Sequence, residues 1–316
     1  MVVNFGMSSS GYWRFIAIRL LQLILVVIGI GSVLFFLLRL SGDPVAVMLG
    51  PDAPEETRLQ MRRSLGLDDP LVVQYGRFMK SLLVLDFGDS LRSGEPALSV
   101  ALRRLPATLE LAGAAFAAVA LVGVSVGVLV ATARHTIFSN ALLSLVFAAQ
   151  AIPGFWLGLL LILVFAVHLR VLPSVGHGTL AHLILPTITL GAFYAARIVR
   201  LVRSSVLEAS NQDYVRTARG KGLAPGAVLW NHVLRNAWVP IVSVLFLDAA
   251  QLIGGAVVTE AVFAWPGIGR QLTTSVLGRD YPVVQAIVFL IAVMVVVLNL
   301  LADIIYRLLD PRLEFK

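Results

Sequence analysis

The chain has no cysteine, and only 14% of its 316 residues are charged. Without cysteine there is no disulfide framework, no thiolate metal site and no cysteine nucleophile. Soluble domains carry about 25% charged residues, so this shortage of charge excludes a single soluble globular domain. Intrinsic disorder is excluded as well, because 58% of the residues are hydrophobic and such a chain can bury enough apolar surface to order.

The few charges are unbalanced, with 25 Lys and Arg against 18 Asp and Glu, for a net charge of +7. In a soluble protein such an excess would suggest nucleic-acid binding. In a membrane protein the same excess is typical of cytoplasmic loops. We therefore expect membrane lipid as a partner and no nucleic acid.

Long apolar segments dominate the chain. A helix that crosses the membrane needs about 20 mostly apolar residues, and six segments meet this length when one internal acid is allowed. The third segment contains Pro153, which predicts a kink within one helix. We predict a single all-α, polytopic membrane domain over residues 1–316, with spans at about 15–38, 108–133, 139–167, 180–202, 236–259 and 281–306.

The distribution of Lys and Arg predicts the orientation. If the N-terminus is inside, the short outer loops hold only Arg170, Arg270 and Arg279. The inner positions are Arg14, Arg19, Arg134, Arg197, Arg200, Arg203, Arg216, Arg219, Lys221, Arg235, Arg307, Arg312 and Lys316. Because basic residues concentrate in cytoplasmic loops, we expect both termini to be cytoplasmic.

Two hydrophilic segments lie between the predicted spans. The external loop, residues 39–104, contains Ala53–Leu65, whose pattern predicts a short surface helix. The other segment is the inner loop, residues 203–235. We find no internal repeat of the kind that many secondary transporters carry.

Three short motifs resemble catalytic, nucleotide-binding or metal-binding patterns, but in each case a structural interpretation is favoured. Gly123–Gly127 spells G-x-S-x-G around Ser125, which is typical of a hydrolase, but the same spacing lets helices pack closely within a membrane. Gly220–Gly222 lacks the outer glycine and the Ser or Thr of a nucleotide-binding loop. His177 and His182 favour solvation at the membrane interface over a metal site, so we expect no metal and no catalytic residue.

Asp248 is the one acidic residue deep within a predicted span, and Gln251 follows it on the same helical face. An intramembrane charge is costly and faces a cavity or a partner group. Two interpretations stay open. The pair lines a translocation path, or Asp248 makes a structural hydrogen bond to a neighbouring helix.

The inner loop carries the strongest pattern. Asp213 is suited to cap the start of a helix, Gly222 is suited to end it, and apolar residues between them have helical spacing. A short basic helix is predicted along the cytoplasmic face. Its residues are Asp213, Tyr214, Val215, Arg216, Thr217, Ala218, Arg219, Gly220, Lys221 and Gly222.

This run resembles the cytoplasmic coupling segment of ABC importer permeases, and specifically that of the dipeptide and oligopeptide class. The resemblance extends over nearly the whole chain. Further matching blocks, in order, are Ser41–Val45, Leu65–Leu71, Asp86–Ser90, Leu105–Leu111, Thr259–Phe263, Trp265–Gly269, Arg279–Pro282 and Leu309–Arg312. Arg216-Thr217-Ala218 stands where the broad family has Glu-Ala-Ala, which is typical of the peptide class.

The resemblance implies a type I importer permease in the bacterial inner membrane. It implies a second homologous permease subunit, two cytoplasmic ATPase subunits that bind ATP and Mg²⁺, and an extracytoplasmic binding protein. The short helix at Asp213–Gly222 would couple ATPase movement to the spans, and a bulky residue at Ala218 or Gly222 would block docking. No cofactor is expected in this chain.

The substrate stays open on the sequence alone. The resemblance implies dipeptides or oligopeptides, and members of the same class import glutathione, nickel chelates or other small solutes. An intramembrane hydrolase that uses Ser125 or Asp248 is the alternative from a different class, and a secondary transporter or channel is a third.

Overall fold

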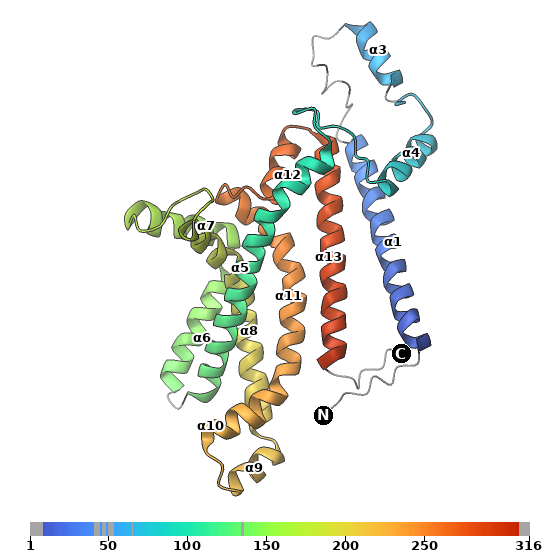
Figure 1. Ribbon diagram of the computed structural model, residues 1–316. Coiled ribbons are helices and arrows are strands. Elements are labelled where there is room, and N and C mark those ends of the chain that lie inside the picture. The colour runs from blue at the N-terminus through green and yellow to red at the C-terminus, as the bar shows by residue number, and fades with distance from the viewer. Residues whose placement is uncertain are drawn as a thin grey trace. The chain divides into compact units, whose positions relative to one another are not determined.

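The computed structural model describes residues 9–40, 45, 49, 54–64, 66–133 and 136–309, and within these residues it contains helices and no β-strand. The long helices are α1 (Ser9–Leu40), α5 (Ala97–Thr132), α8 (Leu180–Ser210), α11 (Arg235–Val262) and α13 (Tyr281–Leu309). Figure 1 shows them as extended rods. The all-α prediction is confirmed.

The shorter elements lie between these helices. They are α3 (Glu55–Ser64), α4 (Leu71–Leu83), α6 (Thr136–Ala151), α7 (Gly154–Leu161), α9 (Asp213–Gly220), α10 (Pro225–Val228) and α12 (Ile268–Leu277), together with π-helical turns at Ile162–His168 and Leu229–Leu234. α3 falls within the surface helix predicted at Ala53–Leu65, both of whose end residues lie outside the described residues.

Four described helices are long and apolar enough to cross a membrane, namely Ala97–Thr132, Leu180–Ser210, Pro225–Val262 and Tyr281–Tyr306. A fifth crossing is present if the bent pair Ile137–Ala151 and Gly154–His168 counts as one span. Within α1 the described apolar stretch is Ile24–Phe36. The count of six spans therefore stays a prediction.

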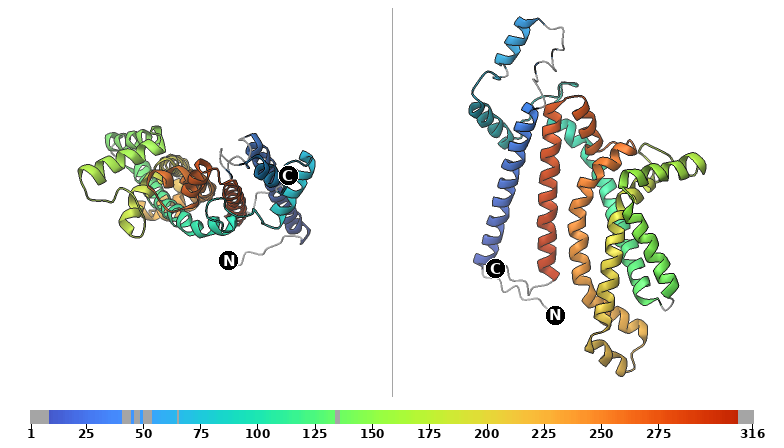
Figure 2. Two further views of the ribbon diagram at one scale, coloured as in Figure 1. Left: turned by 90° about the horizontal axis from the view of Figure 1, so that it is seen from above. Right: turned by 180° about the vertical axis from the view of Figure 1, so that it is seen from behind.

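The third predicted span is not one kinked helix. At Pro153 the chain breaks into two helices that meet at 108°, and Figure 2 shows the bend between α6 and α7. Proline lacks the N–H that would continue the ladder, and the residue before it disfavours helical geometry. The expected single helix over 139–167 is therefore corrected to a broken pair.

Several helices extend beyond their predicted spans. α5 begins at Ala97, inside the predicted external loop, and α8 continues to Ser210, well past residue 202. The 31 residues of α8 rise about 46 Å, more than the roughly 30 Å of hydrocarbon. Apolar composition identifies only the part of a helix that contacts lipid. From the sequence alone, the charged ends of these helices therefore look like loops.

The chain divides into two compact units that interleave in sequence. The first comprises Met1–Arg103 and Leu272–Val296. Within it α4 packs on α1, where Gly31 makes room for the side chains of Met79 and Leu82. The Tyr75 hydroxyl lies 2.7 Å from that of Ser32, so a polar contact joins these two helices as well.

The second unit comprises Arg104–Gln271 and Val297–Lys316. α8 and α11 pack along each other at its centre, and α9 and α10 lie at the opposite end of α8 from α7 (Figure 1). α5 approaches α8 closely through two glycines. A Cβ at Gly123 would lie 2.8 Å from Ile198, and one at Gly127 would lie 2.6 Å from Val202.

The substitution Gly127→Ala tests this close approach. Its Cβ would meet Val202 at 2.6 Å and the Val199 carbonyl oxygen at 3.0 Å, so we expect a loss of about 1–3 kcal/mol. Gly113→Ala is the matched control in the same helix, because no atom lies within 4 Å of its Cβ. Thermal unfolding of the purified protein measures both, and unchanged stability of Gly127→Ala would contradict the packing.

Candidate functional site

The short helix α9 packs one side against its own chain. Val215 and Ala218 are 0% and 4% exposed and belong to a core with Val206 of α8 and with Val233 and Leu234 of the π-helical turn that precedes α11. α8 and the π-helical turn Leu229–Leu234 therefore hold α9 through apolar contacts. The sequence interpretation that a bulky residue at Ala218 would obstruct docking is corrected, since Ala218 faces inward.

The two ends of α9 differ from each other. The N-cap residue is Gln212, so the prediction that Asp213 caps the helix is wrong, and Asp213 lies in its first turn. At the other end Gly222 has φ +79° and donates to the Arg219 carbonyl at 2.9 Å, while Leu223 donates to the Ala218 carbonyl at 3.4 Å. This pair of bonds is a Schellman motif, and it gives Gly222 the terminating position that the sequence predicts.

The outer face of α9 is exposed and carries more basic than acidic side chains. An ion pair of 3.8 Å between Arg216 and Asp213 lies on it and is nearly fully solvated, so it adds little stability. Apart from Val215 and Ala218, all residues of the predicted segment are exposed, namely Asp213, Tyr214, Arg216, Thr217, Arg219, Gly220, Lys221 and Gly222.

Asp248 and Gln251 have different surroundings. The Asp248 side chain is 1% exposed, and its Oδ1 accepts a hydrogen bond of 2.7 Å from Nη1 of Arg197 on α8. Gln251 lies on the exposed side of α11. The sequence interpretation counted Arg197 among the inner basic positions and missed this pairing, because the two partners lie 51 positions apart on different helices.

A buried carboxylate that the sequence interpretation left without a role lies at the end of α11. Glu260 is fully buried and accepts hydrogen bonds from the Thr108 hydroxyl (2.6 Å) and from the backbone N–H groups of Gly269 (2.7 Å) and Arg270 (3.1 Å). The Thr108 hydroxyl oxygen in turn accepts from the N–H of Ile268 at 2.9 Å. These bonds cap the first turn of α12, where N–H groups lack helical partners.

Two glycines permit this capping. A Cβ at Gly267 would lie 2.3 Å from the Glu260 carboxylate, and one at Gly269 would lie 2.3 Å from the Val257 backbone. Trp265 is fully buried beside them, and its indole N–H donates to the Ala107 carbonyl at 2.7 Å. The blocks Leu105–Leu111, Thr259–Phe263 and Trp265–Gly269 therefore form one packed cluster.

A similar carboxylate stands in the first unit. Asp280 is 2% exposed, and it accepts hydrogen bonds from the Ser90 hydroxyl at 2.5 Å and from the Leu91 N–H at 3.1 Å. The Ser90 hydroxyl oxygen accepts from the N–H groups of Arg92 and Ser93. The segment before α5 is thereby attached to the residue that precedes α13.

The histidines that the sequence singled out have protein partners. Nε2 of His177 lies 2.8 Å from the Glu110 carboxylate, and Nδ1 of His182 lies 2.8 Å from the Thr179 hydroxyl. Within the described residues, no group of three or more His, Cys, Asp or Glu side chains could hold a metal ion.

Ser125, the candidate nucleophile, lies on the exposed side of α5, opposite the glycines that pack on α8.

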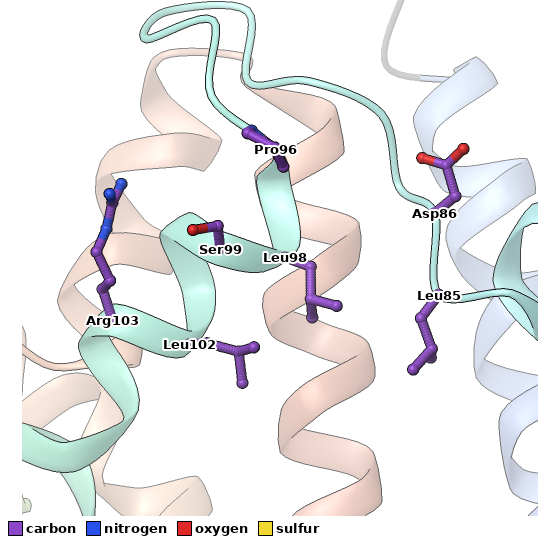
Figure 3. A pocket seen from close by; sticks show the side chains of 7 residues that line it. All are labelled: Leu85, Asp86, Pro96, Leu98, Ser99, Leu102 and Arg103. Atoms are coloured by element: carbon purple, nitrogen blue, oxygen red, sulfur yellow. The ribbon is translucent and has the colours of Figure 1, made fainter.

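Figure 3 shows a shallow pocket of about 600 Å³ in the first unit, near the start of α5. Its lining residues are Leu85, Asp86, Pro96, Leu98, Ser99, Leu102 and Arg103. The Arg103 guanidinium is engaged by Glu95 in a two-point pair, one bond of which is 3.0 Å long. Its hydrogen bonds to Arg103 lower the pKa of the Glu95 carboxyl.

Comparisons with known proteins agree with the blocks in the sequence. Residues 123–315 match the family of binding-protein-dependent transport system inner membrane components, and residues 12–112 match the N-terminal region of such membrane components. A probable peptide ABC transporter permease protein of Sinorhizobium fredii is 40% identical over 306 residues, covering 94% of this chain and 98% of that protein.

A dipeptide transport system permease protein of Escherichia coli K12 is 37% identical over 336 aligned positions, covering 96% of this chain and 99% of that protein. An inward-facing structure of the MetNI methionine ABC transporter superposes with a TM-score of 0.57 at 22% identity, over 67% of this chain and 96% of that chain. At this identity the likeness concerns the fold alone.

The capping of α12 predicts a large effect of one hydroxyl. Thr108→Val removes a donor to Glu260 and an acceptor for Ile268, and we expect it to cost at least about 1–3 kcal/mol because buried polar groups lose their partners. Thr108→Ser should keep nearly full stability. The control is Thr132→Val, whose hydroxyl donates to carbonyls of its own helix. Equal thermal stability of Thr108→Val and Thr132→Val would contradict the cluster.

Proposed function

The chain belongs to the family of binding-protein-dependent transport system inner membrane components, and on this premise we propose that it is one of two permease subunits of an ATP-driven peptide importer. It is a transport subunit, and in this family a separate subunit hydrolyses ATP. The names of relatives that are 37–40% identical over nearly the whole chain support peptides as the substrate.

The observation that carries the proposal is the two-sided character of α9. One side is held by the buried residues Val215 and Ala218, and the other presents exposed polar and basic groups. A contact that transmits force needs a stiff element that is anchored to the moving helices. The Schellman motif at Gly222 and the apolar contacts to α8 and α11 supply this anchorage.

We propose the following cycle on this basis. Two cytoplasmic ATPase subunits bind ATP and Mg²⁺ and close on each other, and the exposed face of α9 follows one of them. α8 and α11 move with α9, and the path opens outward to accept a peptide from the extracytoplasmic binding protein. After hydrolysis the path opens inward, and no bond in the peptide changes.

The path itself is proposed to run beside α8 and α11. Gln251 is exposed on α11, and the buried Asp248 is linked to the half-exposed Arg197. Both observations support polar groups of these helices as part of the wall.

The exposed face of α9 predicts a separation between docking and stability. Tyr214→Asp together with Arg219→Glu should abolish co-purification of the ATPase subunits and peptide uptake, with an unchanged melting temperature, because both side chains are exposed. Ala218→Glu should instead lower the melting temperature by burying a charge. Arg63→Glu, an exposed charge reversal on α3, is the control. Retained ATPase subunits and uptake in the α9 double variant would refute the coupling role.

The orientation is tested by single cysteines, since the chain has none. Ser93→Cys and Asn211→Cys place thiols at exposed residues on opposite sides of the proposed topology. An impermeant thiol reagent added to cells with a permeabilised outer membrane should label position 93 and spare position 211 until the inner membrane is opened. The reverse pattern would overturn cytoplasmic termini.

A further inference from the structure

The Arg197 side chain is partly exposed, although the carboxylate that it contacts is buried. Its side chain is 45% exposed, whereas that of Asp248, to which it donates at 2.7 Å, is 1% exposed. Both residues lie within predicted spans, on α8 and α11, which pack along each other. Within the described residues Asp248 accepts from one of the five N–H groups of Arg197, so the guanidinium retains donors on its exposed side.

Arg197 belongs to an exposed stripe along α8. The preceding exposed residue at helical spacing is Phe193, four positions before Arg197, and the following one is Arg200, three positions after it. The Arg200 guanidinium lies 5.7 Å from the centre of the Phe147 ring, in cation–π geometry. Arg197 therefore differs from Arg200, because Asp248 holds the Arg197 guanidinium in place, whereas the Phe147 ring covers that of Arg200.

The charged Arg197 side chain is not suited to face lipid. A charged side chain within a span faces a bundle interior, a partner group or a water-filled cavity, because hydrocarbon offers it no hydrogen bonds. A planar guanidinium with outward donors matches a carboxylate in shape and charge. Peptides carry such a group at their C-terminus.

We propose that Arg197 is a binding residue for the C-terminal carboxylate of a peptide in transit, and that Asp248 is its positioning residue. This inference rests on the proposed function of peptide import. Asp248 fixes the guanidinium and offsets part of its charge, which weakens its attraction for the passing carboxylate. Weak binding suits a path, because a substrate must leave each site as readily as it enters.

The experiment uses the complete importer in proteoliposomes, with both permease subunits, the ATPase subunits and the binding protein. Uptake of one tripeptide is compared with that of its C-terminal amide, each at a concentration that saturates the binding protein. We expect the wild type to take up the free acid faster than the amide. Arg197→Gln should lose this preference, because its uptake of the acid alone should fall about tenfold, which corresponds to the loss of one charge-assisted hydrogen bond. Arg200→Gln is the matched control and should keep the preference.

Asp248→Asn distinguishes positioning from mere structure. With the guanidinium no longer offset by an anion, the acid should bind more tightly and leave more slowly, so KM and the maximal uptake rate should both fall while the preference for the acid persists. A structural pair would lower the rate with no fall in KM.

Three results would overturn the inference. Arg197→Gln could retain the preference for the acid, could slow acid and amide equally, or could release the second permease subunit, which would assign the guanidinium to an interface between subunits. Failure of the wild-type importer to take up either tripeptide would instead refute the proposed function itself.

Discussion

Burial of the Glu260 carboxylate is the constraint on which the second unit depends. A carboxylate removed from water is stable only where donors surround it, and here Thr108 of α5 and the first N–H groups of α12 converge on it. Their convergence requires glycine at 267 and 269, since a Cβ at either position would overlap Glu260 or the α11 backbone. One buried charge thereby fixes the end of α11, the approach of α5 and the start of α12.

The other end of the same unit is fixed by apolar contacts. Val215 and Ala218 of α9 are buried in the core that α8 and α11 share, and the glycines of α5 pack on α8 beside it. The intervening helices are continuous, because α8 extends over 31 residues and the helix that includes α11 extends from Pro225 to Val262. A displacement of α9 is therefore expected to reach the Glu260 cluster, because these continuous helices contain no flexible loop that would absorb it.

Sequence patterns predicted the features that follow from composition and from glycine. The long apolar segments predict the all-α fold class. Gly222 predicts the C-terminal end of α9, because a φ of +79° favours glycine. Equivalent Schellman turns at Ala264 and Arg279 escaped prediction because their C′ residues are not glycine. The contacts Arg197–Asp248, Glu260–Thr108 and Asp280–Ser90 could not be predicted, since the two residues of each pair lie more than 50 positions apart in sequence. Pro153 was predicted to kink one helix, whereas the structure has two helices that meet there at 108°.

We expect the second unit to move as one body from α9 to the end of α11. Spin labels at Thr217 and Val258, both exposed residues of that unit, report this directly in the assembled importer by pulsed electron paramagnetic resonance. We expect the Thr217–Val258 distance to be the same in the nucleotide-free and ATP-bound states, while the distance from Thr217 to a label on the second permease subunit changes. A shift of the Thr217–Val258 distance on ATP binding would contradict it.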